Sequence, residues 1–249
     1  MTYSAYHPDR TPRRVVSREE WLKARTALLA QEKEITRLRD KLSAARRELP
    51  WVKVEKRYVF DAPEGKVALA DLFDGRSQLA VYHFMLTPGS DHICDGCSFI
   101  ADHVDAARQH FEHADLSFAA VSRAPLAQIL PVKQRMGWRF RWVSSYGSDF
   151  NYDYGVSFTD EEIAKGSVAY NYGTTPYALP DLPGTSIFAK DDAGQVFHTY
   201  SAYSRGGEIL IGALNWLDFT PKGRNEDSIM SWVRLHDEYG KASAACCHS

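Results

Sequence analysis

The chain has 249 residues, of which 44% are hydrophobic and 25% are charged, the ordinary composition of a globular protein with a sizeable core. A net charge of -2 leaves no basic excess for binding nucleic acid. No apolar run reaches the roughly 18 residues of a membrane span, and the first residues, MTYSAYHPDRTPRRVVSREEW, lack the apolar core of a signal peptide. We therefore expect a cytoplasmic protein with no nucleic-acid or membrane partner, and in that compartment structural disulfides are rare.

The first predicted element is a long helix over residues 18–49. Its sequence is rich in helix formers and contains no Gly or Pro, Ser17 and Glu20 form a capping-box pattern, and Pro50 marks the end. Apolar residues recur every seven positions, as in a coiled coil. This stripe either lies on the chain's own domain or packs against a second copy in a homodimer. Its members are Trp21, Leu28, Ile35, Leu42 and Leu49.

From residue 51 onward, strand and helix patterns alternate. Residues 51–73 read as a hairpin or edge strands, 77–86 as a buried central strand, 97–115 as a helix, 116–124 as a second buried strand and 125–138 as a helix. A third strand follows over 140–147, then two strands around Asp-Asp-Ala-Gly at 191–194, and a last helix over 227–240. This order predicts an α/β domain with a mixed sheet.

Two cysteines, Cys94 and Cys97, lie where the central strand leads into the next helix, in HICDGCSF. In this context the Cys-x-x-Cys spacing favours a redox couple. Free N–H groups at the start of a helix stabilise a thiolate, the reactive form of cysteine. We assign Cys94 as the nucleophile and Cys97 as the resolving thiol, and we expect no cofactor. Asp95 opposes the ionisation of Cys94.

Two other readings of the cysteine pair remain. A structural metal site usually needs four ligands, and the other cysteines are Cys246 and Cys247 in the tail. Together with His92 and His248 they would form a set of sulfur and imidazole donors for a soft metal, copper or zinc. A thiol peroxidase of the peroxiredoxin type places Thr three residues before the reactive cysteine and Pro seven before. Those positions hold Asp91 and Thr87 here, so the peroxidase pattern is absent.

Several long blocks resemble the bacterial family called domain of unknown function 899. They are YHFML, the cysteine block, AVSRAPL, KQRMGWRFRWVSSYGSDFNYDYGVSF, SIFAKDDAGQVFHTYSAY and LDFTPKGR, and the resemblance runs from about residue 15 to residue 240. It implies a thioredoxin-like fold. Relatives carry a cysteine block closer to Gly-Cys-Pro-Ser-Cys-Ser-Phe. This chain has Asp95-Gly96 between its cysteines instead, which alters the expected redox potential.

The resemblance also implies a cis-proline that faces the cysteines from just before a strand. Pro183 in DLPGTSIF is the candidate, as part of the substrate-binding surface. The alternative is an ordinary turn proline before a glycine.

Three further residues are weaker candidates. Arg123 follows a buried strand, where α/β sheets place their sites, and would supply positive charge to a thiolate or an anionic substrate; a surface ion pair is the simpler account. Tyr146 belongs to the aromatic stretch SSYGSDFNYDYG, either a pocket wall near the thiols or a loop packed on its own rings. For His103 we favour a satisfied buried imidazole over a proton shuttle.

These patterns divide the chain into an N-terminal helical arm over residues 1–50, a thioredoxin-like domain over 51–240 and a flexible Cys-Cys-His tail over 241–249. The expected function is that of a thiol–disulfide oxidoreductase or redox-responsive protein acting on protein or small-molecule thiols and disulfides. A soft-metal-binding protein on the same scaffold is the alternative.

Overall fold

The fold is known from a computed structural model, which describes residues 14–240. Its largest element is an eight-stranded sheet in the order β1-β10-β9-β4-β5-β6-β2-β3. The sheet strands are β1 (Val52–Lys53), β2 (Val59–Ala62), β3 (Gly65–Ala68), β4 (Gln78–His83), β5 (Leu116–Ser122), β6 (Arg141–Ser144), β9 (Gly184–Lys190) and β10 (Val196–Tyr203). A separate hairpin is made of β7 (Val168–Tyr170) and β8 (Gly173–Thr175).

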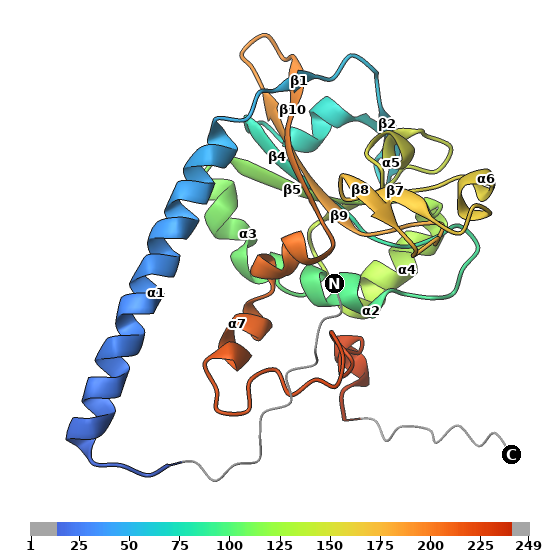
Figure 1. Cartoon of the computed structure of the whole chain (residues 1–249). Helices are drawn as coiled ribbons and strands as arrows, with labels where there is room; N and C mark the ends of the chain where they lie inside the picture. The colour runs from blue at the N-terminus through green and yellow to red at the C-terminus, as the bar shows by residue number, and fades with distance from the viewer. Residues whose placement is uncertain (1–13, 241–249) are drawn as a thin grey trace, which may run out of the picture.

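The helices flank this sheet (Figure 1). They are α1 (Arg18–Arg47), α2 (Asp95–Ala101), α3 (Val104–His113), α4 (Leu126–Met136), α5 (Phe150–Asp153), α6 (Asp160–Ile163) and α7 (Gly212–Asp218), with 3-10 helices at Leu69–Phe73, Ser204–Leu210 and His236–Glu238. None of the helices within the described residues is long and apolar enough to cross a bilayer.

The centre of the sheet has the expected thioredoxin-like arrangement. Strands β4, β5 and β6 are parallel, whereas β9 is antiparallel to β4 and β10 is antiparallel to β9. The helix that follows β4 begins within the cysteine pair. This confirms the predicted α/β class, with its mixed sheet, flanking helices and long N-terminal helix.

Side chains of β4 alternate between the two faces of the sheet, as strand geometry requires. Leu79 and Val81 belong to a core closed by the 3-10 helix at Leu69–Phe73, the β2–β3 hairpin and Phe150. Tyr82 belongs to the opposite core, which contains Cys97 and is closed by α2, α3 and α4. The central strand therefore presents one group of side chains to the cysteine helix and another to the far face.

Helix α1 begins where its sequence predicts. The Ser17 hydroxyl accepts from the backbone N–H of Glu20 at 3.2 Å, and the Glu20 carboxylate accepts from the backbone N–H of Ser17 at 3.1 Å, which completes the capping box. The helix runs along one side of the molecule, and its C-terminal end leads into β1 (Figure 1). None of its residues is buried, so its apolar stripe does not lie in the core of its own domain.

Two predicted helices differ from the structure. The helix expected over 97–115 is divided into α2 and α3 at Asp102 and His103. The helix expected over 227–240 is instead a series of turns followed by the short 3-10 helix at His236–Glu238. Met230 there adopts a φ of 58°, and its backbone N–H donates to the Glu226 carboxylate at 2.8 Å. The last α-helix of the described residues is therefore α7. The sequence analysis also did not predict the β7–β8 hairpin.

Candidate functional site

Cys94 is the N-cap residue of α2 and stands at the end of the loop that follows β4. Its sulfur accepts a hydrogen bond from the backbone N–H of Cys97 at 3.3 Å, in the position that Ser, Thr or Asp usually occupies. Both thiols are free. The sulfur of the N-cap cysteine is therefore held against the first turn of the helix by the backbone of the second cysteine.

Burial separates the two thiols. Cys97 is 1% exposed, whereas Cys94 is half-buried. Hydrogen bonding to the Cys97 thiol is the largest cause that lowers the pKa of Cys94, and the backbone N–H groups of Cys97 and Gly96 lower it further, while burial and the Asp95 carboxylate oppose the shift. Burial is the largest cause that raises the pKa of Cys97 well above its ordinary value, followed by its interaction with Cys94. Cys94 is thus the more accessible and more acidic thiol, as predicted.

A third sulfur lies beside the pair. The Cys94 thiol approaches the Met85 thioether at 3.9 Å, and the backbone N–H of Met85 donates to the Cys97 sulfur at 3.4 Å. Met85 lies two residues after the end of β4, so the segment that follows the central strand supplies both a donor for the buried sulfur and a soft neighbour for the outer one.

Tyr82 is a site residue that the sequence analysis missed. It is 2% exposed and shares the core of Cys97, and its buried hydroxyl has no fully formed hydrogen bond among the described residues. The hydroxyl nevertheless lies near enough to Cys97 to lower the pKa of that thiol against the larger effect of burial. The available signal was strand parity, because Tyr82 is the one buried residue of β4 that has a polar group on the cysteine side of the strand.

The chain after α7 covers the outer face of α2. A side chain at Gly96 would contact Met230, since an added Cβ would lie 3.4 Å from the Met230 Cε atom. The ring centroids of Phe99 and Trp232 are 5.7 Å apart, and Leu235 joins the core of Cys97. The C-terminal segment therefore packs on the cysteine helix, and a Cβ at position 96 would make ordinary van der Waals contact with it.

Arg123 is held in an ion pair with Asp181. Its Nε atom donates to Asp181 at 2.9 Å and its second terminal nitrogen donates to the same carboxylate at 3.1 Å. Asp181, 4% exposed, also accepts from the hydroxyls of Thr87 at 2.5 Å and Ser157 at 2.6 Å. The predicted ion pair is thus present, in a part-buried rather than a surface form, and it ties the cysteine loop to the segment before β9. The substrate-binding role of Arg123 stays a prediction.

Pro183 lies at the same edge of the sheet as the cysteine loop. Gly184 pairs with His83, the last residue of β4, and the Pro183 carbonyl accepts from the Tyr170 hydroxyl. Burial is the largest cause that raises the pKa of Tyr170, and Cys97 raises it further, so this tyrosine is within electrostatic range of the buried thiol. No peptide bond within residues 14–240 is cis. The expected cis isomer at Pro183 is therefore wrong, and the substrate-binding role of Pro183 stays a prediction.

Two other candidates have different outcomes. Tyr146 is 56% exposed on the loop after β6, and no contact between its side chain and the cysteines is seen in the described part of the chain. Its substrate-binding role therefore stays a prediction.

The His103 imidazole has both of its nitrogens bonded. Its Nδ1 donates to the Phe99 carbonyl at 2.7 Å, and its Nε2 accepts from the backbone N–H of Ala213 at 3.0 Å. This is the satisfied imidazole that the sequence favoured.

Within residues 14–240, no group of three or more His, Cys, Asp or Glu side chains is placed to hold a metal ion. The tail residues of the metal hypothesis, Cys246, Cys247 and His248, lie outside the described residues.

The family model for DUF899, described as a bacterial protein of unknown function, matches residues 10–239. No curated protein gives a significant match to the sequence. Solved structures with some similarity include the peroxidoxin BcpB from Mycobacterium tuberculosis, with 12% identity and a TM-score of 0.43 over 68% of this chain and 96% of that one. Peroxiredoxin Q from Xanthomonas campestris has 15% identity and a TM-score of 0.41 over 67% and 94% of the two chains. The mitochondrial 2-Cys peroxiredoxin from Plasmodium falciparum has 16% identity and a TM-score of 0.40 over 68% and 95%.

Proposed function

We propose that this chain, which belongs to the DUF899 family of bacterial proteins, is a thiol–disulfide oxidoreductase that uses Cys94 and Cys97. The observation that carries the proposal is the asymmetry of the pair. One thiol is partly accessible with a lowered pKa, and its neighbour is buried with a raised pKa. An attacking thiol must be ionised and reachable, whereas a resolving thiol needs only to reach the first sulfur.

The reaction begins when the Cys94 thiolate attacks one sulfur of a substrate disulfide. A bond forms between Cys94 and that sulfur, and the second substrate sulfur leaves as a thiolate that takes a proton from solvent. Cys97 then loses its proton and attacks the Cys94 sulfur, and the first substrate sulfur leaves in turn. The substrate has gained two electrons and the pair is a disulfide, which a cellular dithiol reduces again.

The second step requires ionisation of a buried thiol. In the mixed disulfide, Cys94 carries no charge, so its contribution to the raised pKa of Cys97 disappears and burial remains. The Tyr82 hydroxyl and the backbone N–H of Met85 act in the opposite direction, because both lower the pKa of Cys97. We assign Tyr82 as the donor that stabilises the Cys97 thiolate during release.

The experiment is reduction of a disulfide-bonded peptide by the full chain with dithiothreitol as the reductant. We expect Cys94→Ser to abolish the acceleration over dithiothreitol alone, and Cys97→Ser to accumulate a mixed disulfide that intact-mass spectrometry detects. A Cys246→Ser, Cys247→Ser double variant should keep full activity. Equal rates with and without Cys94 would contradict the proposal.

One observation favours a second candidate function, soft-metal binding. The thioether of Met85 lies 3.9 Å from the Cys94 sulfur, so three sulfur atoms gather at the end of β4. Thiolate and thioether ligands select Cu(I), which makes copper a better match than zinc.

A copper titration with a competing chelator tests this candidate. One tight Cu(I) per chain in the wild type, weakened at least tenfold by Met85→Leu, would support it. Equal affinity in wild type and Met85→Leu would remove Met85 as a ligand and with it the reason to prefer copper.

A further inference from the structure

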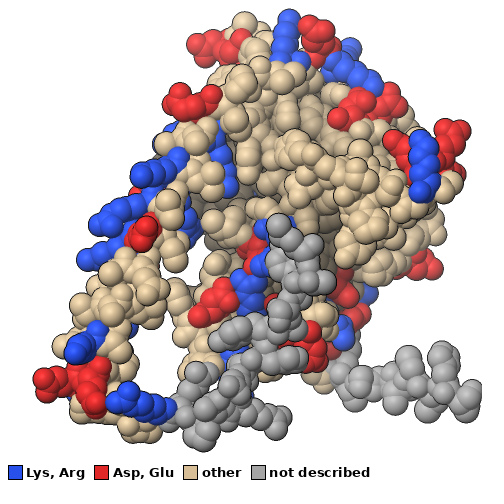
Figure 2. Space-filling model, viewed as in Figure 1, with Lys and Arg blue, Asp and Glu red and all other residues tan. Residues whose placement is uncertain are grey.

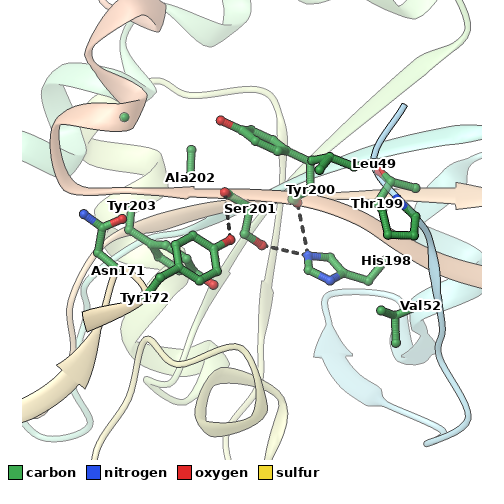
Figure 3. A pocket seen from close by; sticks show the side chains of 12 residues that line it. Leu49, Val52, Asn171, Tyr172, His198, Thr199, Tyr200, Ser201, Ala202 and Tyr203 are labelled. Carbon is green, nitrogen blue, oxygen red and sulfur yellow. Dashed lines mark hydrogen bonds between the residues drawn. The ribbon is translucent and has the colours of Figure 1, made fainter. Parts of the chain in front are cut away.

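A cavity lies along β10 and shares no residue with the cysteine site. Its volume is about 540 Å³, within the range of small-molecule sites. Three parts of the chain bound it, as Figure 3 shows: the segment from the end of α1 into β1, the turn of the β7–β8 hairpin, and β10 with the start of the 3-10 helix that follows it. The lining residues are Leu49, Pro50, Val52, Asn171, Tyr172, His198, Thr199, Tyr200, Ser201, Ala202, Tyr203 and Gly206.

None of these lining residues is charged, and the one cation placed against a lining ring within the described residues is Arg46, whose guanidinium already packs over Tyr200 at 5.3 Å. The surface over β10 and the β7–β8 hairpin is almost wholly uncharged in Figure 2, whereas Lys and Arg gather over α1. Burying a charge without a partner is costly, so this cavity selects an uncharged ligand. The tyrosine rings that line it favour a planar aromatic one, because rings pack well against each other in edge-to-face or offset geometry.

Tyr172 forms one wall in an unusual backbone conformation. Tyr170 pairs with Gly173, so Asn171 and Tyr172 form a two-residue turn with φ values of 54° and 60°. The second position of such a turn strongly prefers Gly, and a left-handed residue with a side chain costs about 1–2 kcal/mol. The Tyr172 hydroxyl donates to Ser201 O at 3.1 Å, and its ring lies 5.6 Å from that of Tyr203. The strained position therefore holds an aromatic ring over β10.

His198 supplies a polar group to the same cavity. Its Nε2 atom lies 3.1 Å from Tyr200 O and 2.8 Å from the Ser201 hydroxyl. A carbonyl can only accept, so Nε2 carries the proton and Nδ1 is an acceptor. Nδ1 makes no hydrogen bond within the described residues. Burial, the largest cause, lowers the pKa of His198, which keeps the imidazole neutral near pH 7.

A chain of hydrogen-bonding groups that leads into the core fixes the orientation of His198. The Ser201 hydroxyl is 2.9 Å from that of Ser186, which is 2.9 Å from Nε2 of the buried His83. A ring fixed in this way offers its free acceptor in one direction, which is how small-molecule sites orient a ligand.

We propose that this cavity binds an uncharged planar aromatic molecule that carries one hydrogen-bond donor, of which a phenol is the simplest. The aromatic ring packs against Tyr172 and Tyr203, and the donor bonds Nδ1 of His198. This site is independent of the thiol chemistry proposed for Cys94 and Cys97.

The test uses three probes with the same ring: p-cresol, toluene and 4-methylbenzoate. Binding to the full chain is followed by NMR chemical-shift titration. We expect saturable one-site binding of p-cresol, at least tenfold tighter than that of toluene, which lacks the donor, or of 4-methylbenzoate, which is charged. Equal binding of the three probes, or no saturable binding of p-cresol, overturns the proposal.

Variants of the lining residues test whether p-cresol binds in this cavity. Tyr172→Gly relieves the left-handed strain while removing the ring, so the protein should stay folded by circular dichroism and bind p-cresol at least tenfold more weakly. His198→Phe should lose the preference for p-cresol over toluene. The matched control is Tyr177→Ala, because Tyr177 is 70% exposed and outside the cavity. Undiminished binding by folded Tyr172→Gly overturns the assignment of the site.

Discussion

His83 carries the most perturbed imidazole of the molecule's core. It is 1% exposed and packs near the rings of Phe150 and Tyr154, with centroids 5.5 Å and 6.0 Å away. Burial lowers the pKa of His83 to about 3, and the neighbouring His198 adds to the effect. The folded protein therefore keeps this ring neutral at pH values where the unfolded chain would protonate it.

Stability should consequently depend on pH through His83. Its pKa is about 3 in the folded state against 6.5 for the free side chain, so the unfolded state binds more protons between these values. The free energy of unfolding should fall as pH falls through this window, by up to about 1.4 kcal/mol per pH unit. Chemical denaturation at several pH values should show that the free energy of unfolding depends less steeply on pH in His83→Gln than in the wild type or in the exposed-site control His113→Gln. An unchanged slope in His83→Gln would be inconsistent with a neutral buried ring.

Tyr82→Phe isolates the role of one hydroxyl. A hydrogen bond to a charged group contributes about 1.5–3 kcal/mol, so loss of the Tyr82 donor should slow the release step roughly tenfold or more. Alkylation of Cys94 should stay within about twofold of the wild-type rate, because the hydroxyl acts on Cys97. Stopped-flow measurement of mixed-disulfide release gives the comparison, with the exposed-site variant Tyr177→Phe as control. If Tyr82→Phe slowed alkylation and mixed-disulfide release equally, the Tyr82 hydroxyl would have a structural role only.

The cysteines could be found from sequence because spacing and the preceding apolar strand locate them together. Tyr82 was missed because its importance depends on which face of β4 it occupies and on what covers that face. Arg123 was placed correctly at a strand end. Its partner Asp181 lies 58 positions away, and no local sequence pattern identifies an ion-pair partner at that separation.

At the scale of elements, Asp181 joins three loops. It bonds Thr87 in the cysteine loop, Arg123 after β5, and Ser157 after α5. A carboxylate that accepts this many hydrogen bonds in a nearly dry environment fixes the position of each donor. The loop that leads to Cys94 is thereby anchored to the segment that carries Pro183.

Asp181→Asn should destabilise the protein by about 3 kcal/mol, because removing one partner leaves the partly buried charge of Arg123 uncompensated. Urea denaturation measures the effect, and the exposed-site variant Asp192→Asn should change stability by less than about 0.5 kcal/mol. A similar small change in both variants would mean that the Arg123 pair is solvated and does not anchor the loop.

The elements that sequence mispredicted are those in which long-range contacts decide local structure. The expected helix over 97–115 is interrupted at Asp102, whose carboxylate accepts from Trp138 Nε1 and bonds His236 Nδ1, both at 2.7 Å. Residues 227–240 have a helical pattern, yet Met230, Val233 and Leu235 pack individually against α2 and its neighbours. Strands β4, β5, β9 and β10 were predictable because their apolar runs and turns are local signals.

At the scale of the whole molecule, α1 is the least integrated element. Trp21 is 45% exposed, Leu28 49%, Ile35 58% and Leu42 52%, although they form one stripe. Arg46 lies over the Tyr200 ring at 5.3 Å, close to the helix end. Burial of such a stripe against a partner contributes about 25 cal/mol per Å² of apolar surface, so a homodimer through α1 remains our expectation.

Light scattering of the full chain tests the dimer. We expect a dimer for the wild type and a monomer when Leu28, Ile35 and Leu42 are all changed to Glu, or when residues 1–49 are deleted. A triple change of the charged residues Lys23, Lys33 and Lys41 to Glu serves as a control that should keep the dimer. A monomeric wild type would rule out the α1 interface.

The proposed function rests on the difference in accessibility and pKa between the two thiols, and the pH dependence of alkylation measures this difference most directly. Iodoacetamide is reacted with the full chain from about pH 5 to about pH 10, and peptide mass spectrometry follows each cysteine. Cys94 should react first, with a rate that rises through a pKa below the value measured in the same chain unfolded in guanidinium chloride, and Cys97 should react only above that value. Faster reaction at Cys97, or a Cys94 pKa equal to that of the unfolded chain, would contradict the assignment of Cys94 as the nucleophile.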